Sequence, residues 1–158
     1  MKKVAKFYKV SQEQFLQDGS LEAYNSIILP KRATKGSAGY DFFAPEEFTL
    51  LPGQTIKVAT GVRVQIEDGW VLKIYPRSSL GFKYRLSLNN TVGIIDSDYY
   101  HADNEGHIFI KMTNCGDKSL TIEKGKAFAQ GIFVEYGITF DDDCDLERTG
   151  GIGSTDKK

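Results

Sequence analysis

The chain has 158 residues, 41% of them hydrophobic and 26% charged, which is typical of one globular domain. Twenty Lys and Arg against 21 Asp and Glu give a net charge of −1, without the basic excess typical of nucleic-acid-binding proteins. The apolar runs are too short to cross a bilayer, so no membrane association is expected. Residues 1–10 do not resemble a secretory signal, and the two cysteines form no disulfide framework. We therefore expect a cytoplasmic protein.

The N-terminal residues 1–24 differ in pattern from the rest of the chain. Apolar residues between positions 4 and 10 predict a short strand. Ser11 followed three residues later by Gln14 is a capping-box pattern, which predicts a short helix that ends before Gly19. This segment exceeds what a minimal β domain needs.

From about residue 27 to residue 140 apolar and polar residues alternate with a period of two, which is typical of half-buried strands. Turn signals such as Asp68-Gly69 and Lys124-Gly125 separate the strands. Strands are expected over residues 56–58, 62–66, 70–74, 108–112, 120–122 and 128–134. Many short strands joined by such turns predict an all-β sandwich, barrel or jelly roll.

Two short polar segments follow strand patterns and are candidate sites of chemistry. Arg77–Ser79 comes where the strand before Pro76 ends, although a solvated arginine in a turn has the same pattern. Asp96 follows the apolar pair 94–95 and could accept a proton from water, or it could cap its own backbone in a turn. Asp41 is open to the same two interpretations. No one of these segments decides the function alone.

The C-terminal segment changes in composition. Acidic residues dominate 141–147, and Arg148 is then followed by three glycines and three hydroxyl side chains up to Thr155. Such a segment is typical of a frayed terminus. The alternative is a phosphate-binding arm, because glycine backbone N–H groups, hydroxyls and an arginine all donate to anions.

Taken in order, these segments resemble the motifs of the trimeric dUTP pyrophosphatases (dUTPases). The matching segments are Ala38–Phe42, Pro76–Leu80, Asn90 with Gly93–Tyr99, Gly125 with Ala129–Gln130, and Arg148–Thr155. Five motifs in the right order are a specific signal, whereas one would be weak. The resemblance implies a jelly-roll-like β domain over residues 1–140, with residues 141–158 as a mobile arm that closes over a neighbour's site. It also implies a homotrimer with active sites shared between chains.

The resemblance implies hydrolysis of dUTP to dUMP and pyrophosphate, which keeps uracil out of DNA and supplies dUMP for thymidylate synthesis. Asp96 is the expected catalytic residue, which orients and deprotonates the water that attacks the α-phosphorus. A carboxylate with the ordinary pKa of about 3.9 is a weak base, so positioning is its main task. Mg²⁺ is the expected cofactor, held by substrate oxygens and waters, with Asp41 binding it through water.

The same resemblance assigns the nucleotide contacts. The residues expected at the phosphates are Arg77, Ser78, Ser79 and Gln130, joined by Arg148, Gly153, Ser154 and Thr155 of the arm. The residues expected at the uracil are Asn90, Gly93, Ile94 and Ile95, with Phe109 lining the pocket. Tyr99 is expected against the deoxyribose, where it leaves no room for a 2′-hydroxyl.

Two departures from the motifs stand out. Ile152 occupies the position where most of the family has a phenylalanine that stacks on uracil, and no aromatic residue follows Phe140. Stacking on a base contributes ~1–3 kcal/mol, so the arm closes more weakly or another ring substitutes. Residues 101–105 look like an insertion, which is either a surface loop or a compensating contact.

Two other functions stay open at this point. The related dCTP deaminases share the fold and carry a catalytic Glu before a Gly, which Glu105-Gly106 matches. A deaminase or a bifunctional deaminase–dUTPase is therefore one alternative. The other is a dUTPase-like trimer with an added regulatory role. Its unknown protein partner would bind residues 1–24 and 101–105, which catalysis does not require.

Overall fold

The computed structural model describes residues 1–148, 150, 151 and 153, and it confirms the predicted all-β fold. The strands are β1 (Ala5–Lys9), β2 (Lys31–Arg32), β3 (Tyr40–Phe43), β4 (Phe48–Leu50), β5 (Thr55–Ala59), β6 (Val62–Ile66), β7 (Trp70–Pro76), β8 (Leu86–Leu88), β9 (Gly93–Ile95), β10 (Phe109–Asn114), β11 (Leu120–Ile122) and β12 (Ala127–Glu135). The helices are α1 (Gln12–Phe15), α2 (Leu21–Asn25), α3 (Ser78–Tyr84) and the 3-10 helix η1 (Ser97–His101). Among the described residues no helix is both long and apolar enough to cross a membrane.

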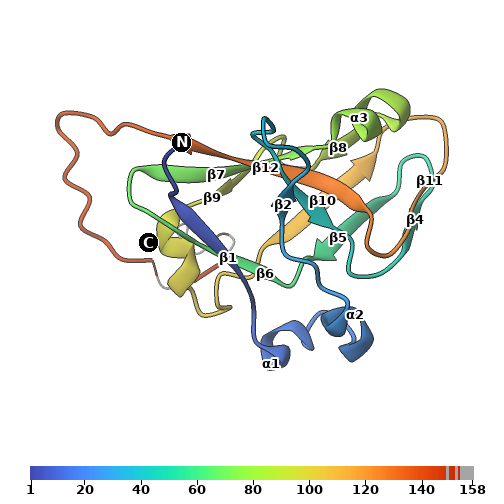
Figure 1. The fold of residues 1–158 in the computed structure, drawn as a ribbon, viewed down its shortest axis with the longest axis horizontal. Coiled ribbons are helices and arrows are strands. Elements are labelled where there is room, and N and C mark those ends of the chain that lie inside the picture. The colour runs from blue at the N-terminus through green and yellow to red at the C-terminus, as the bar shows by residue number, and fades with distance from the viewer. Residues whose placement is uncertain (149, 152, 154–158) are drawn as a thin grey trace.

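All strand pairs are antiparallel, as in a jelly roll, and they form sheets of five, three, two and two strands (Figure 1). The five-stranded sheet has the order β2-β3-β12-β7-β9, and the three-stranded sheet has the order β5-β10-β8. In the larger sheet Gln130 of β12 lies opposite both Asp41 of β3 and Tyr75 of β7. Strand β9 is at the edge of this sheet, and among the described residues its one strand partner is β7.

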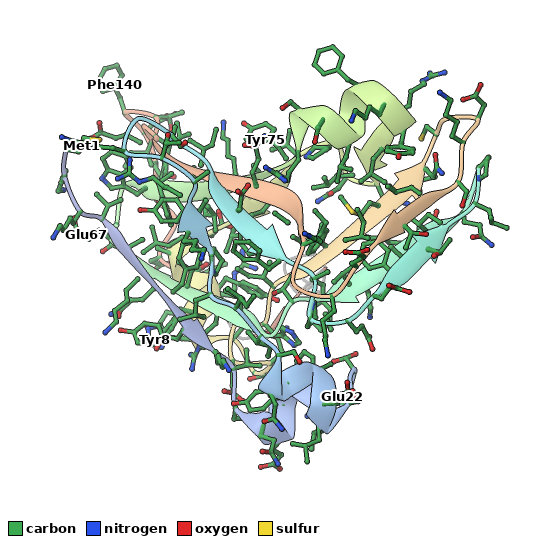
Figure 2. The ribbon with its side chains drawn as sticks, turned by 45° about the vertical axis from the view of Figure 1, so that its right-hand side comes forward. Met1, Tyr8, Glu22, Glu67, Tyr75 and Phe140 are labelled. Atoms are coloured by element: carbon green, nitrogen blue, oxygen red, sulfur yellow. The ribbon has the colours of Figure 1, made fainter. Side chains whose placement is uncertain are left out.

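The period-two pattern has the expected physical cause, because alternate residues of the strands point into the core. Burial alternates along β4, β6, β10 and β11. Figure 2 shows the side chains that fill the space between the sheets. The largest fully buried hydrophobic side chains are Phe15, Phe42, Leu72, Ile74, Ile108, Ile110, Met112 and Phe128.

The N-terminal segment is part of the β domain. Strand β1 pairs along its whole length with β6. Helix α1 begins after Ser11, whose side chain accepts a hydrogen bond from the Gln14 backbone N–H at 3.1 Å. Helix α2 begins in the same way after Ser20, which accepts from the Ala23 N–H. The sequence pattern had predicted neither α2 nor α3.

After β12 the chain leaves the sheets. Residues 136–148 contain no helix or strand, and Phe140 points away from the body of the protein into solvent (Figure 2). The segment then turns back and returns to the protein beside η1, as its red trace in Figure 1 shows. The arm therefore reaches the region where β9 ends.

Candidate functional site

A hollow of about 500 Å³ lies between the turn that joins β8 to β9, strand β10 and the returning arm. It gathers most of the residues that the sequence predicted to hold uracil and sugar. The predicted residues that line it are Asn90, Gly93, Ile94, Ile95, Asp96, Tyr99, Phe109, Arg148 and Gly153. We call this hollow the nucleoside pocket.

The edge position of β9 gives the nucleoside pocket its hydrogen-bonding capacity. Within the described residues the outer edge of β9 has no strand partner, so the backbone groups on that side are open to a ligand. Gly93 allows the strand to approach β7 closely, because an added Cβ would lie 3.0 Å from the Ile74 Cβ. A backbone edge with fixed N–H and C=O groups, beside the amide of Asn90, can pair with a nucleobase.

Asp96 lies at the rim of the nucleoside pocket, where β9 ends and η1 begins. It occupies the N-cap position of η1 but makes no capping hydrogen bond, so the turn-capping interpretation is wrong. Its carboxylate is about half exposed, and its Oδ2 accepts a hydrogen bond from the Arg148 Nη2 at 2.8 Å. The Arg148 Nε lies 2.9 Å from the Asp98 Oδ1, so the guanidinium faces two carboxylates of its own chain.

Tyr99 forms a buried wall of the nucleoside pocket. Its hydroxyl donates to the His107 carbonyl at 2.6 Å and accepts from the Asn104 Nδ2 at 2.9 Å. Burial raises the pKa of Tyr99, although the Asn104 hydrogen bond and the charge of Arg148 act in the opposite direction. The phenol therefore stays neutral at physiological pH. The two hydrogen bonds at its hydroxyl fix the position of the ring.

A second, smaller hollow of about 150 Å³ gathers Arg77, Ser78 and Gln130 of the residues expected at the phosphates, whereas Arg148 and Gly153 line the nucleoside pocket. Asp41, Arg77, Ser78 and Gln130 line the smaller hollow, and the Arg77 Nε lies 3.2 Å from the Asp41 Oδ1. Gly39 leaves room for Gln130, because an added Cβ would lie 2.7 Å from its Oε1. We call this hollow the phosphate pocket.

The single chain does not bring the two pockets together. No described residue lines both the nucleoside pocket and the phosphate pocket, so Asp96 does not face Ser78 or Gln130 of its own chain. Ser79 is exposed on α3 and lines neither pocket. Within the single chain, Arg148 of the arm pairs with Asp96 and Asp98.

Glu105 points away from the nucleoside pocket. Its carboxylate accepts hydrogen bonds from the Ser11 backbone N–H and hydroxyl, and it lies 3.8 Å from the Arg63 Nη1. It does not line the nucleoside pocket, so it is not placed to act on a bound base. The match of Glu105-Gly106 to a deaminase motif is therefore coincidental.

The carboxylates offer a metal ion little direct coordination. Among the described residues no group of three or more His, Cys, Asp or Glu side chains could hold a metal ion. Asp41 is the carboxylate that lines the phosphate pocket, and Arg77 already engages one of its oxygens. This arrangement fits a metal held mainly by substrate oxygens and water, with Asp41 at a distance.

The sequence prediction missed several residues of the nucleoside pocket. Lys57 and Lys111 line it because they are opposite each other in the β5–β10 register, which the sequence does not reveal. Asn104 lies outside this pocket, in the presumed insertion, but it contacts the Tyr99 hydroxyl and was also missed. The predictions for Ile152, Ser154 and Thr155 lie outside the described residues.

Comparison with known proteins gives one consistent result. A family model described as dUTPase matches residues 25–155. The deoxyuridine 5′-triphosphate nucleotidohydrolase of Lactococcus lactis is 45% identical over 132 residues, which cover 82% of this chain and 88% of that protein.

Solved structures agree with this result. The dUTPase of Streptococcus mutans has a TM-score of 0.67 and 36% identity, and the match covers 84% of this chain and 97% of that one. The dUTPase of the Staphylococcus aureus phage phi11, described as coordinating a structural Mg(II) ion, shares the fold at 20% identity with a TM-score of 0.66. That match covers 91% of this chain and 98% of the phage chain. The chain therefore belongs to the dUTPase family.

Proposed function

We propose that this dUTPase hydrolyses dUTP to dUMP and pyrophosphate, with Asp96 holding the attacking water. The position of Asp96 carries the proposal. Its carboxylate is about half exposed at the rim of the nucleoside pocket, and it makes no capping hydrogen bond to η1. From there it orients a water molecule toward the α-phosphorus and accepts its proton as the bond to pyrophosphate breaks.

The nucleoside pocket accounts for the choice of nucleotide. The open edge of β9 and the Asn90 amide pair with the uracil edge. Tyr99 forms the wall against the sugar, and a packed wall rejects an added hydroxyl by steric exclusion. Ser78 and Gln130 bind the phosphate chain, and Arg77 supplies positive charge.

A homotrimer would join the two pockets by placing the nucleoside pocket of one chain against the phosphate pocket of another. An apolar groove beside the phosphate pocket supports this arrangement, because it includes Ile132 and the highly exposed Phe82. Ile94, on the rim of the nucleoside pocket, is also half exposed. Apolar side chains at both edges are suited to burial between copies.

Arg148 acts as the movable charge of the site. In the described chain it pairs with Asp96 and Asp98, and a triphosphate offers the guanidinium a stronger, bidentate partner. When Arg148 leaves the carboxylates for the phosphates, Asp96 is released to hold water. Substrate binding and activation of the base are thereby coupled.

The phosphate oxygens of the substrate would hold Mg²⁺ directly, and Asp41 would hold it through a water molecule. When bound, Mg²⁺ neutralises charge on the departing pyrophosphate. We place the enzyme in the cytoplasm, because both cysteines are free and exposed, as suits a reducing compartment.

The neighbouring carboxylates allow a matched test of Asp96. Both Asp96→Asn and Asp98→Asn remove one charge facing Arg148, but only Asp96 lines the nucleoside pocket. With Mg²⁺ and dUTP, we expect Asp96→Asn to lower kcat by about 10²-fold or more while Kd changes little. Asp98→Asn should keep kcat within about threefold of the parent. Near-normal pyrophosphate release by Asp96→Asn would contradict the assignment.

A further inference from the structure

The N-terminal extension, residues 1–24, is tied to the loop 102–106 by an unusual helix cap. In a capping box the residue three positions after the cap accepts from the cap backbone N–H. Here that role belongs to Glu105, whose Oε1 accepts from the Ser11 N–H at 2.9 Å. The Glu105 Oε2 accepts from the Ser11 hydroxyl at 2.5 Å, so one carboxylate completes the cap of α1.

The loop around Glu105 is held in one conformation. Glu105 has a φ of +60°, which a residue with a side chain adopts only when its surroundings enforce it. Arg63 links this loop to η1: its Nη1 lies 3.8 Å from the Glu105 Oε1, its Nη2 donates to the Tyr100 carbonyl, and its guanidinium lies 3.7 Å from the centre of the Tyr100 ring. Burial tends to raise the pKa of Glu105, but the Ser11 hydrogen bonds and the Arg63 charge lower it, so the carboxylate stays ionised.

The next residue toward the pocket, Asn104, connects this loop to the sugar wall. Its Oδ1 accepts from the Gly106 N–H at 3.1 Å, which fixes the orientation of the amide. Its Nδ2 then donates to the Tyr99 hydroxyl at 2.9 Å. The hydroxyl itself donates to the His107 carbonyl, so the tip of Tyr99 is held by one acceptor and one donor. Neither Asn104 nor Glu105 lines the nucleoside pocket.

We propose that Asn104, anchored through Glu105 to the N-terminal extension, is a positioning residue that fixes the Tyr99 wall and so sharpens the preference for deoxyribose over ribose. This inference rests on the proposed function. Steric rejection of a 2′-hydroxyl requires the Tyr99 ring to stay in place. A ring that can shift leaves enough space for the extra oxygen. The family match begins at residue 25, so the segment that carries Ser11 lies outside the matched residues, although β1 belongs to the same β domain.

The test is the ratio of kcat/KM for dUTP to that for UTP, measured by pyrophosphate release from the full chain. Loss of one hydrogen bond to Tyr99 in Asn104→Ala should lower this ratio about three- to tenfold, mainly through faster UTP cleavage. Tyr99→Phe removes the hydroxyl that Asn104 contacts. In that background Asn104→Ala should change the ratio no further, which a general loss of structure would not reproduce.

Two serines provide a matched pair for the anchor. Ser11 and Ser20 each cap a short helix of the extension, but only Ser11 contacts Glu105. Ser11→Ala and Ser20→Ala should each lower stability through loss of a helix cap, and Ser11→Ala should lower it more, because the Ser11 hydroxyl also donates to Glu105. Ser11→Ala should also lower the dUTP/UTP ratio, about twofold or more, whereas Ser20→Ala should leave it unchanged. This pair decides the question even where Asn104→Ala does not fold.

The outcomes separate the two proposals. A parent protein that does not cleave dUTP overturns the proposed function. A parent that cleaves dUTP with strong preference over UTP, together with an Asn104→Ala ratio equal to the parent's, overturns only the role of Asn104. Equal ratios in Ser11→Ala and Ser20→Ala overturn the anchoring through Glu105.

Discussion

Acidification should destabilise the protein through His107, which is fully buried and whose carbonyl accepts a hydrogen bond from the Tyr99 hydroxyl. Its Nε2 accepts a hydrogen bond from the Gly61 backbone N–H at 2.9 Å, so the neutral ring carries its proton on Nδ1. Among the described residues Nδ1 has no hydrogen-bond partner. A second proton would place an N–H donor on Nε2 against the Gly61 donor.

Burial lowers the pKa of His107 to about 4, and the Lys57 charge acts in the same direction, while Asp18 and Glu105 oppose it. In the unfolded chain a histidine titrates near 6.5. Because the folded state takes up the proton less readily, the stability from neutral His107 is complete above about pH 6.5. It is lost as the pH falls from there toward 4, and the difference corresponds to roughly 3 kcal/mol.

Urea unfolding followed by Trp70 fluorescence between pH 4 and 8, at fixed protomer concentration, measures this loss. His107→Gln is the matched control, because its amide oxygen can accept from the Gly61 N–H but does not titrate. We expect the free energy of unfolding of the parent to fall more steeply than that of His107→Gln below pH 6.5. Parallel curves for the two proteins would refute the reasoning.

Two further substitutions test other features. Gly61→Ala should destabilise the fold by about 2–4 kcal/mol, because φ is +69° and the added Cβ would lie 2.2 Å from the Ile27 Cδ1. Gly53→Ala, with φ +82° but open space, is the control that isolates the backbone contribution, and equal urea midpoints would contradict the clash. Ile152→Phe should tighten binding of a non-hydrolysable dUTP analogue about tenfold by calorimetry, through stacking on uracil. Unchanged affinity would show that another side chain already covers the base.

The strands could be predicted because their residues obey a local rule. Alternating burial in β6 and β10 follows directly from side chains that point to opposite faces of a strand. Helix α3 was missed because its first turn, Ser78-Ser79-Leu80, reads as a turn after Pro76. Its end at Arg85 requires a positive φ on a residue that rarely adopts it, which sequence pattern does not reveal.

The site was predictable in its parts but not in its arrangement. The ordered motifs predicted Asp96 and Arg77 as site residues from their residue types, and the structure places each of them at a pocket. Their separation into two pockets depends on sheet order, which no spacing in the sequence specifies. The Glu105–Ser11 contact joins residues 94 positions apart and was equally hidden.

The pairing of β1 with β6 has a practical consequence for work with shortened fragments. A fragment trimmed to the family match at residue 25 would lose this strand together with the buried side chains of Val10 and Phe15. Each such side chain contributes about 1.5–3 kcal/mol, which is a large share of a typical margin of about 5–15 kcal/mol. Met1 is fully exposed, so an affinity tag belongs in front of the intact chain rather than in place of its first residues.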